Sequence, residues 1–310
     1  GKGLSELMSA QQNIVALTAA MPSGTGTSVI AKAHPARFFD VGIAEAHAIT
    51  MAAGLATQGI RPVAAIYSTF LQRAYDSIIH DVAIQRLPVI FCMDRAGLVG
   101  EDGETHAGLY DIAYMLAIPN MTVTAPKNGR EMLGLLRSAV EHTSGPFALR
   151  YPRDAAPDLP PAIGEIDPVP YRTWEVLRQG TPKEVAILAV GTMVLPSLAA
   201  AETLAGEGLS VTVVNCRYLK PYDELTLAAV VADHKHLLVV EEGTVVNGFG
   251  AYMASVVATM DPGVRVISHG VPDRIIYAAS RARQLAACGL DAAGIAERVR
   301  ALHESEAVTG

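Results

Sequence analysis

The chain has 310 residues, of which 50% are hydrophobic and 18% charged, with a formal net charge of −7 and an isoelectric point near 5.7. This length favours two domains of roughly 150 residues each, with enough apolar side chains to form a core in both. The acidic balance argues against a general nucleic-acid or anionic-membrane surface, because such surfaces need clustered lysine and arginine. An anion bound by this chain must therefore be held by a few placed residues.

The cysteine pattern and the hydropathy indicate in which cellular compartment the chain is expected. The three cysteines, Cys92, Cys216 and Cys288, lie far apart and fit neither a disulfide framework nor the spacing of a metal site. No apolar stretch approaches the length of a membrane span, and the first residues do not resemble a signal peptide. We expect a cytoplasmic protein with no membrane or nucleic-acid partner.

The hydrophobic pattern predicts alternating strands and helices from residue 36 onward. The predicted strands of the first half are 37–41, 62–67, 88–93, 121–124 and 146–150, and the predicted helices are 43–58, 69–86, 108–117 and 128–142. A second series has strands near 185–190, 211–214, 237–241 and 264–268, and helices near 195–207, 222–232, 249–260 and 291–303. This alternation predicts two α/β domains, each a doubly wound parallel sheet covered by helices.

A segment rich in proline and acidic residues, 152–170, interrupts the alternation and is interpreted as an interdomain linker. Open parallel sheets bind ligands at the carboxyl ends of their strands. The turns at those ends are 41–45, 67–70, 94–106 and 150–153 in the first domain and 241–250 in the second. We expect functional side chains to gather there.

The first of these turns carries Glu45, which begins a predicted helix in an otherwise apolar sequence. An acidic residue in the first turn of a helix gains from the helix dipole and needs no other role. Ile43 and the neighbouring alanines, however, leave little water for the carboxylate, so it requires a partner or a raised pKa. A structural and a functional role both remain open for Glu45 on this evidence.

The next turn carries Tyr67, Phe70 and Arg73. The two aromatic residues can belong to the core, and the arginine can be an ordinary surface charge. The loop that follows, "DRAGLVGEDGETHAG", is long, polar and rich in glycine, and it includes Asp102 and His106. Loops of this kind in compact domains are disproportionately functional, so we expect a function here.

Three arginines lie at the strand ends, Arg95, Arg150 and Arg153. One of the last two is expected to be a structural ion-pair partner. The other could form a two-point clamp on a phosphate together with Arg95, because guanidinium groups match phosphate geometry.

Several segments taken together resemble one enzyme family. They are "DVGIAEAHAIT", "IYSTFLQRAYDSIIHDVAIQ", "DRAGLVGEDGETHAG" and "LRYPRD" in the first half, and "VNCRYLKPYDE", "VVEEGTVVNGFGAYM" and "HGVPDRII" in the second. Through them the chain resembles roughly the C-terminal two-thirds of the 1-deoxy-D-xylulose 5-phosphate synthases, which are thiamine-diphosphate enzymes of the transketolase superfamily. The resemblance implies a pyrimidine-binding domain over 1–153, a linker over 154–182 and a transketolase C-terminal-like domain over 183–310.

The resemblance also implies roles for the cofactor-binding residues. Glu45 matches the glutamate that hydrogen-bonds a ring nitrogen of the cofactor's aminopyrimidine, Phe70 matches the aromatic residue that stacks on this ring, and Arg73 lies beside it. Ile43 belongs to the same group as part of the apolar surroundings of Glu45. No residue of this chain is expected to bind metal: Mg²⁺ and the cofactor's diphosphate are assigned to an N-terminal domain of the family that this sequence does not contain.

For the substrates, the resemblance implies that Tyr67, Arg95 and Arg153 hold the phosphate of glyceraldehyde 3-phosphate. Asp102 and His106 match polar groups near the reacting carbonyl and hydroxyl, so they join Glu45 as expected catalytic residues. The implied reaction is the condensation of pyruvate with D-glyceraldehyde 3-phosphate to 1-deoxy-D-xylulose 5-phosphate and CO2, and the implied assembly is a homodimer.

Two alternatives remain open at this point. The chain could be the β subunit of a 2-oxo acid dehydrogenase or of another split transketolase-like enzyme, since these have the same two domains. It could also be an inactive dimerisation or binding fragment, because a fold does not guarantee function. The roles of Glu241 and Glu242 are left open between capping the next helix and pairing across a dimer interface.

Overall fold

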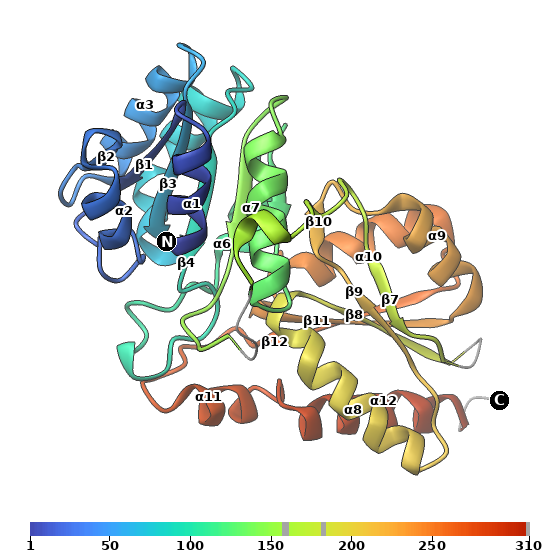
Figure 1. The fold of residues 1–310 in the computed structure, drawn as a ribbon. Helices are drawn as coiled ribbons and strands as arrows, with labels where there is room; N and C mark the ends of the chain where they lie inside the picture. Colours follow the sequence, from blue (N-terminus) through green and yellow to red (C-terminus); the bar gives the residue numbers. More distant parts are fainter. Residues whose placement is uncertain (157–160, 181–183, 308–310) are drawn as a thin grey trace.

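The computed structural model describes residues 1–156, 161–180 and 184–307, with side chains up to residue 304. It contains two α/β units, each built on one sheet (Figure 1). Parts of the predicted linker, 157–160 and 181–183, and the last residues, 308–310, lie outside the described residues.

The first sheet has seven strands, and all but one of them are parallel. Their spatial order is β10 (Tyr218–Lys220), β5 (Thr122–Thr124), β6 (Phe147–Arg150), β4 (Ile90–Asp94), β3 (Arg61–Tyr67), β1 (Ile14–Thr18) and β2 (Phe38–Asp40). The expected parallel sheet is therefore confirmed in its centre. Strand β1 was not predicted, and neither was β10, which the second half of the chain adds antiparallel to β5.

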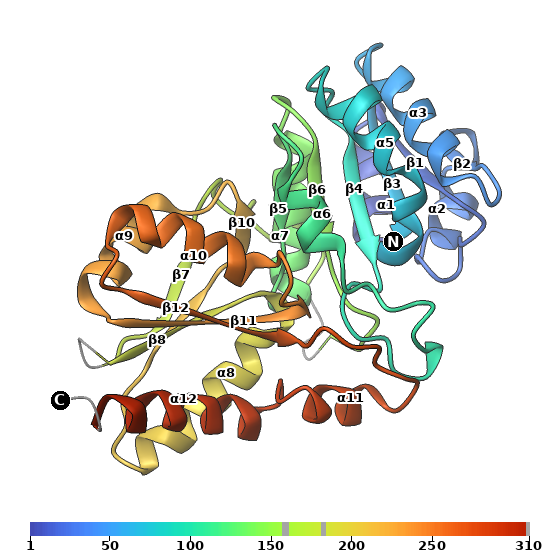
Figure 2. The ribbon, with the colours of Figure 1, turned by 180° about the vertical axis from the view of Figure 1, so that it is seen from behind.

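Helices cover both faces of this sheet. They are α1 (Lys2–Ala10), α2 (Ser28–Ala33), α3 (Glu45–Ala56), α6 (Asp111–Leu116) and α7 (Gly129–Glu141). Figure 1 shows α1 and α7 in front of the sheet, and Figure 2 shows α6 on the opposite face.

The predicted helix 69–86 is instead a series of short turns. They are α4 (Ser68–Leu71), a 3₁₀ turn over Gln72–Ala74, α5 (Tyr75–Ser77) and a π-helical turn over Ile78–Ala83. Such irregular turns often occur at functional sites.

The second sheet has five strands in the order β12 (Arg265–Val271), β11 (His236–Thr244), β8 (Val185–Ala189), β9 (Thr212–Asn215) and β7 (Glu175–Arg178). Only β7 is antiparallel, and it lies inside the segment predicted as linker. The helices are α8 (Val194–Gly206), α9 (Glu224–Asp233), α10 (Phe249–Met260), α11 (Arg281–Ala287) and α12 (Ala292–Ala307). In Figures 1 and 2, α8 and α12 lie on one face of this sheet and α9 and α10 on the other. Helix α11 was not predicted.

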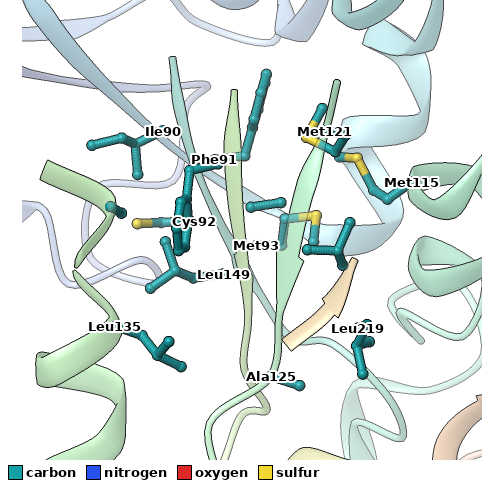
Figure 3. Packing of buried hydrophobic residues seen from close by; sticks show 14 of the residues in the cluster. Ile90, Phe91, Cys92, Met93, Met115, Met121, Ala125, Leu135, Leu149 and Leu219 are labelled. Atoms are coloured by element: carbon teal, nitrogen blue, oxygen red, sulfur yellow. The ribbon is translucent and has the colours of Figure 1, made fainter. Parts of the chain in front are cut away.

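One hydrophobic cluster includes residues of both units, and a second cluster lies mainly in the second unit. Leu219 of β10 is fully buried in the shared cluster and lies near Ala125, which follows β5 (Figure 3). The indole nitrogen of Trp174 donates to the carbonyl of Tyr218 at 2.7 Å and ties β7's segment to β10. Across the described part of the chain, no helix combines the length and apolar composition needed to cross a membrane.

Candidate functional site

The register of the first sheet brings the predicted turns together. Tyr67, the last residue of β3, is paired with Asp94, the last residue of β4, and Met93 is paired with Arg150 at the end of β6. The segments that follow these three neighbouring strands therefore start side by side at one edge of the sheet.

Aromatic and cationic side chains form a stacked row along this edge. The guanidinium carbon of Arg95 lies 3.8 Å from the centre of the Tyr67 ring. The Tyr67 ring stacks on Phe70, with 5.6 Å between centres and an interplanar angle of 12°. Arg73 lies over Phe70 at 4.9 Å, and His106 meets the same ring edge-on at 5.3 Å. Cation–π contacts of this kind fix the direction of both arginines.

Asp102 joins the two arginines of the predicted phosphate clamp. Its Oδ2 accepts from Arg95 Nε at 3.3 Å, and its Oδ1 lies 3.0 Å from Arg153 Nη1. Arg95 also donates to Asp94 at 3.0 Å and to the Gly24 carbonyl at 3.1 Å. The clamp residues thus converge, with a carboxylate between them.

Local backbone geometry is adapted to this arrangement. Arg95 has φ +59°, a left-handed conformation that is costly for a residue with a side chain. A Cβ added to Gly24 would lie 1.9 Å from the Tyr67 hydroxyl oxygen, so only glycine fits there. Burial raises the pKa of Asp94 to about 6, although the neighbouring Arg95 opposes this shift.

Glu45 is the first residue of α3 and is only 3% exposed. Its Oε1 accepts a hydrogen bond from Arg73 Nη1 at 2.6 Å. Ile43, which was expected to shield the carboxylate, is 81% exposed in the single chain and does not shield it there. The described structure pairs the buried Glu45 with a guanidinium, so its charge has a partner.

These contacts connect every predicted site residue except Ile43. A buried carboxylate beside a half-buried aromatic ring offers an acceptor and a stacking face, which fits a flat ring with nitrogen donors such as an aminopyrimidine. Among the described residues, no group of three or more histidine, cysteine, aspartate or glutamate side chains could hold a metal ion.

Other charged residues of the same region have structural roles. Arg150 is 5% exposed and donates to Asp111 at 3.0 Å and to the Glu242 carbonyl at 3.0 Å, so it is the structural ion-pair partner expected of one of the two arginines. Glu241 accepts from the backbone N–H groups of Phe249 and Gly250, both at 2.8 Å. It therefore caps α10, and its complete burial raises its pKa to about 7.

Sequence reasoning missed the contribution of the second domain. Glu242, left unassigned, reaches the loop after β4, and Gln284 on the unpredicted helix α11 does the same. These contacts join residues more than 140 positions apart, which no local spacing reveals. A cavity of about 360 Å³ lies between α7, α8 and α11, and none of the predicted site residues lines it.

Comparison with known families agrees with this fold. Residues 1–158 match the transketolase pyrimidine-binding domain, and residues 172–295 match the transketolase C-terminal domain. The chain therefore belongs to the transketolase family.

Within that family, its curated relatives include the 1-deoxy-D-xylulose-5-phosphate synthase of Synechococcus sp. (strain JA-2-3B'a(2-13)), 47% identical over 310 residues, which are 100% of this chain and 48% of the relative. The corresponding synthase of Thermomicrobium roseum is 49% identical over 301 residues, 97% of this chain and 47% of the relative.

The chain spans about half the length of these relatives and corresponds to their C-terminal portion. The sequence-based estimate of two-thirds was too large. Among solved structures, a protein described as "Split gene transketolase, inactive beta4 tetramer" is 31% identical with a TM-score of 0.85, covering 96% of this chain and 95% of that one. A Pichia stipitis transketolase, 20% identical with a TM-score of 0.78, covers 96% of this chain and 44% of its own, and shares the fold.

Proposed function

We propose that this chain supplies the pyrimidine-binding and C-terminal domains of a thiamine-diphosphate-dependent 1-deoxy-D-xylulose 5-phosphate synthase. The reaction proposed is the condensation of pyruvate with D-glyceraldehyde 3-phosphate to 1-deoxy-D-xylulose 5-phosphate and CO2. The observation that carries this proposal is the connected row from Glu45 through Phe70 and Tyr67 to the Arg95–Asp102–Arg153 cluster. Whole-chain identity to synthases of that name supports it.

In this proposal Glu45, Phe70 and Arg73 hold the aminopyrimidine end of the cofactor. When bound, the cofactor supplies the carbanion chemistry that no protein side chain offers. The Glu45 carboxylate would bond to the ring, either in place of its hydrogen bond from Arg73 or in addition to it. In that position it would hold or return a proton at the ring. Mg²⁺ and the diphosphate are assigned to the portion of the relatives that this chain does not cover.

Tyr67, Arg95 and Arg153 are proposed to hold the substrate phosphate. Arg153 is 48% exposed and reaches the surface, while Arg95 is only 12% exposed, so the pair can grip a dianion from two depths. Asp102 would then orient both guanidinium groups. His106, fixed by Phe70 and by Thr105 at 3.0 Å, is placed to donate a hydrogen bond to a substrate oxygen.

The test compares two activities: formation of 1-deoxy-D-xylulose 5-phosphate and acyl transfer to lipoamide. Both are assayed with this chain joined to the portion of the relatives that it does not cover. Synthase activity supports the proposal, and acyl transfer alone would favour the β subunit of a 2-oxo acid dehydrogenase.

Arg153→Ala should raise the KM for glyceraldehyde 3-phosphate at least tenfold, because a charge-assisted contact to phosphate is lost. The KM for pyruvate should change less than twofold. Arg300→Ala, which removes an exposed ion pair with Glu207, is the matched control. An unchanged KM for the phosphate substrate in Arg153→Ala rules out the clamp.

A second candidate function, that of an inactive oligomer, is favoured by the structural relative described as an inactive tetramer. By analogy, this chain by itself would form an oligomer without turnover, and the homodimer proposed for the complete enzyme would involve the exposed Ile43 near Glu45. Sedimentation of the isolated chain, with calorimetric titration of Mg²⁺-thiamine diphosphate, tests this. Tight, metal-dependent binding of thiamine diphosphate by the chain alone argues against the hypothesis of an inactive oligomer.

A further inference from the structure

The loop after β4 carries Arg95, Asp102 and His106, and the other domain holds it at two points. In both ribbon views this loop extends away from its own sheet to the start of α11 (Figures 1 and 2). Gly97, Gly100 and Gly103 have φ values of +86°, +66° and +78°. Glycine has little conformational preference of its own, so hydrogen bonds must fix this backbone. The pair between Gly97 and Gly108 fixes the base of the loop, and contacts from the second domain hold other points.

Gln284 of α11 binds both backbone polar groups of Gly100 in the loop. It is 3% exposed. Its Oε1 accepts from the Gly100 N–H at 2.8 Å, and its Nε2 donates to the Gly100 carbonyl at 3.3 Å and to the Tyr277 carbonyl at 3.0 Å. A buried amide with donor and acceptor both used specifies the position of its partner.

Glu242 holds the loop at a second point. Its Oε1 accepts from the Leu98 N–H at 2.8 Å, and its Oε2 accepts from the Thr192 hydroxyl at 2.9 Å and from Arg281. A Cβ on Gly97 would lie 2.6 Å from the carboxyl carbon, so the loop backbone lies directly against this side chain.

Arg281 extends the same connection to the segment after β6. Its Nη1 donates to Asp154 at 2.7 Å, while its Nη2 pairs with Glu242. Asp154 directly follows Arg153, and Asp102 follows Gly100 by two residues. Both sides of the 3.0 Å contact between Arg153 and Asp102 are thus anchored to α11.

We propose that Gln284 and Glu242 are positioning residues, through which the second domain sets the place of Asp102 and its two arginines at the site. This proposal rests on the proposed function for its kinetic consequence only. The anchoring itself is a property of the chain, so it has a separate readout.

The anchoring is tested by amide hydrogen exchange on the chain with Gln284→Met, which keeps the size of the side chain and removes its hydrogen bonds. Exchange at Gly100 should be at least tenfold faster, because its N–H loses a buried hydrogen bond and one such bond corresponds to about that factor. Exchange in β4 should stay within twofold. Arg283→Gln, an exposed neighbour on the same helix, should change neither.

If protection of β4 is lost and the variant is unfolded, Glu242→Gln serves instead. It keeps an oxygen for the Leu98 N–H but removes the charge that holds Arg281, so exchange at Gly100 should still accelerate. Unchanged exchange at Gly100 in a folded variant overturns the proposal.

The kinetic arm uses the complete enzyme. Gln284→Met should raise the KM for glyceraldehyde 3-phosphate about tenfold while kcat falls less than threefold, since the loop is displaced and no reacting group is removed. Faster exchange with an unchanged KM overturns the positioning role. If the wild type forms no product, the proposed function fails, and the exchange measurement alone decides whether the loop is anchored.

Discussion

Glu45 lies at the start of α3, pairs with Arg73 and borders the candidate site. The carboxylate lies at the positive end of α3 and against Arg73, and both interactions stabilise its negative form. A ligand that shares a proton with Glu45 must therefore compete with, or rearrange, Arg73.

Replacing Glu45 by glutamine keeps the shape of the side chain and removes its ability to carry a proton as a carboxylate does. We expect turnover of the complete enzyme to fall at least 100-fold, since acid–base groups contribute about that much. The rate of 1-deoxy-D-xylulose 5-phosphate formation measures it, with circular dichroism as the control for folding. A variant that turns over at a near-normal rate contradicts the role proposed for Glu45.

Glu241 provides a pH-dependent test. Burial raises its pKa from 4.5 to about 7, so between these values the folded chain binds more protons than the unfolded chain. The contribution of Glu241 to the free energy of unfolding therefore falls as pH rises from 4.5 through 7, by up to about 3 kcal/mol.

Urea denaturation at pH 5 and pH 8 measures this effect. The free energy of unfolding of Glu241→Gln, relative to that of the wild type, should be higher at pH 8 than at pH 5, because the amide does not ionise. Glu202→Gln, at an exposed position of α8, is the matched control and should show no such difference. Equal stability differences at the two pH values would falsify this account of Glu241.

Among the elements, α7 has a reciprocal cap at its N-terminus. The Asn128 side chain accepts from the Glu131 N–H at 2.9 Å, and Glu131 accepts from the Lys127 N–H at 2.7 Å. Asn128→Ala should lower the free energy of unfolding by about 1 kcal/mol, as loss of such a cap does. Urea denaturation checks this against Asn13→Ala, at an exposed loop position. An equal effect of the two substitutions would mean that the cap adds nothing.

Most of the parallel strands were predicted from the sequence, and the two antiparallel strands were not. Strands β3, β4 and β8 are short apolar runs followed by helices, and the sequence identifies them. Strand β1 reads "IVALT", which is equally apolar, and Leu4, Leu7 and Met8 of the preceding α1 have helical spacing, so both elements were predictable but were missed. Strands β7 and β10 are short edge strands whose pairing partners lie far along the chain, so local periodicity holds no information about them.

The residues of the candidate site also divide into those that the sequence predicts and those that it does not. Residues at strand ends, such as Tyr67 and Arg95, could be predicted because a parallel sheet gathers its carboxyl ends. The anchors Glu242 and Gln284 could not, since each meets the loop only through the packing of two domains. The exposure of Ile43 in the single chain could not be predicted either, because nearness to Glu45 in the sequence does not determine burial.

At the scale of the whole molecule, the two domains form one structural unit. Strand β10 completes the first sheet, and Arg150 links Asp111 to the backbone of Glu242. A chain ending at residue 156 would leave β5 as an unpaired edge and expose the apolar residues that face Leu219.

We expect this truncated chain to aggregate, because an exposed strand edge pairs with other chains. Size-exclusion chromatography with light scattering detects the change. Adding residues 161–310 as a separate chain should restore a discrete complex, which is the control. A monomeric 1–156 chain with an undiminished free energy of unfolding contradicts the shared-core description.

Strand β10 also has a consequence for the order of events during synthesis. The parallel part of the first sheet is complete when β6 ends at Arg150, but its last strand begins only at Tyr218. At roughly 5–20 residues per second, a ribosome needs about 3–14 seconds to make the stretch between them. For that interval the growing chain carries an open strand edge, so this is the window in which a chaperone would protect it most.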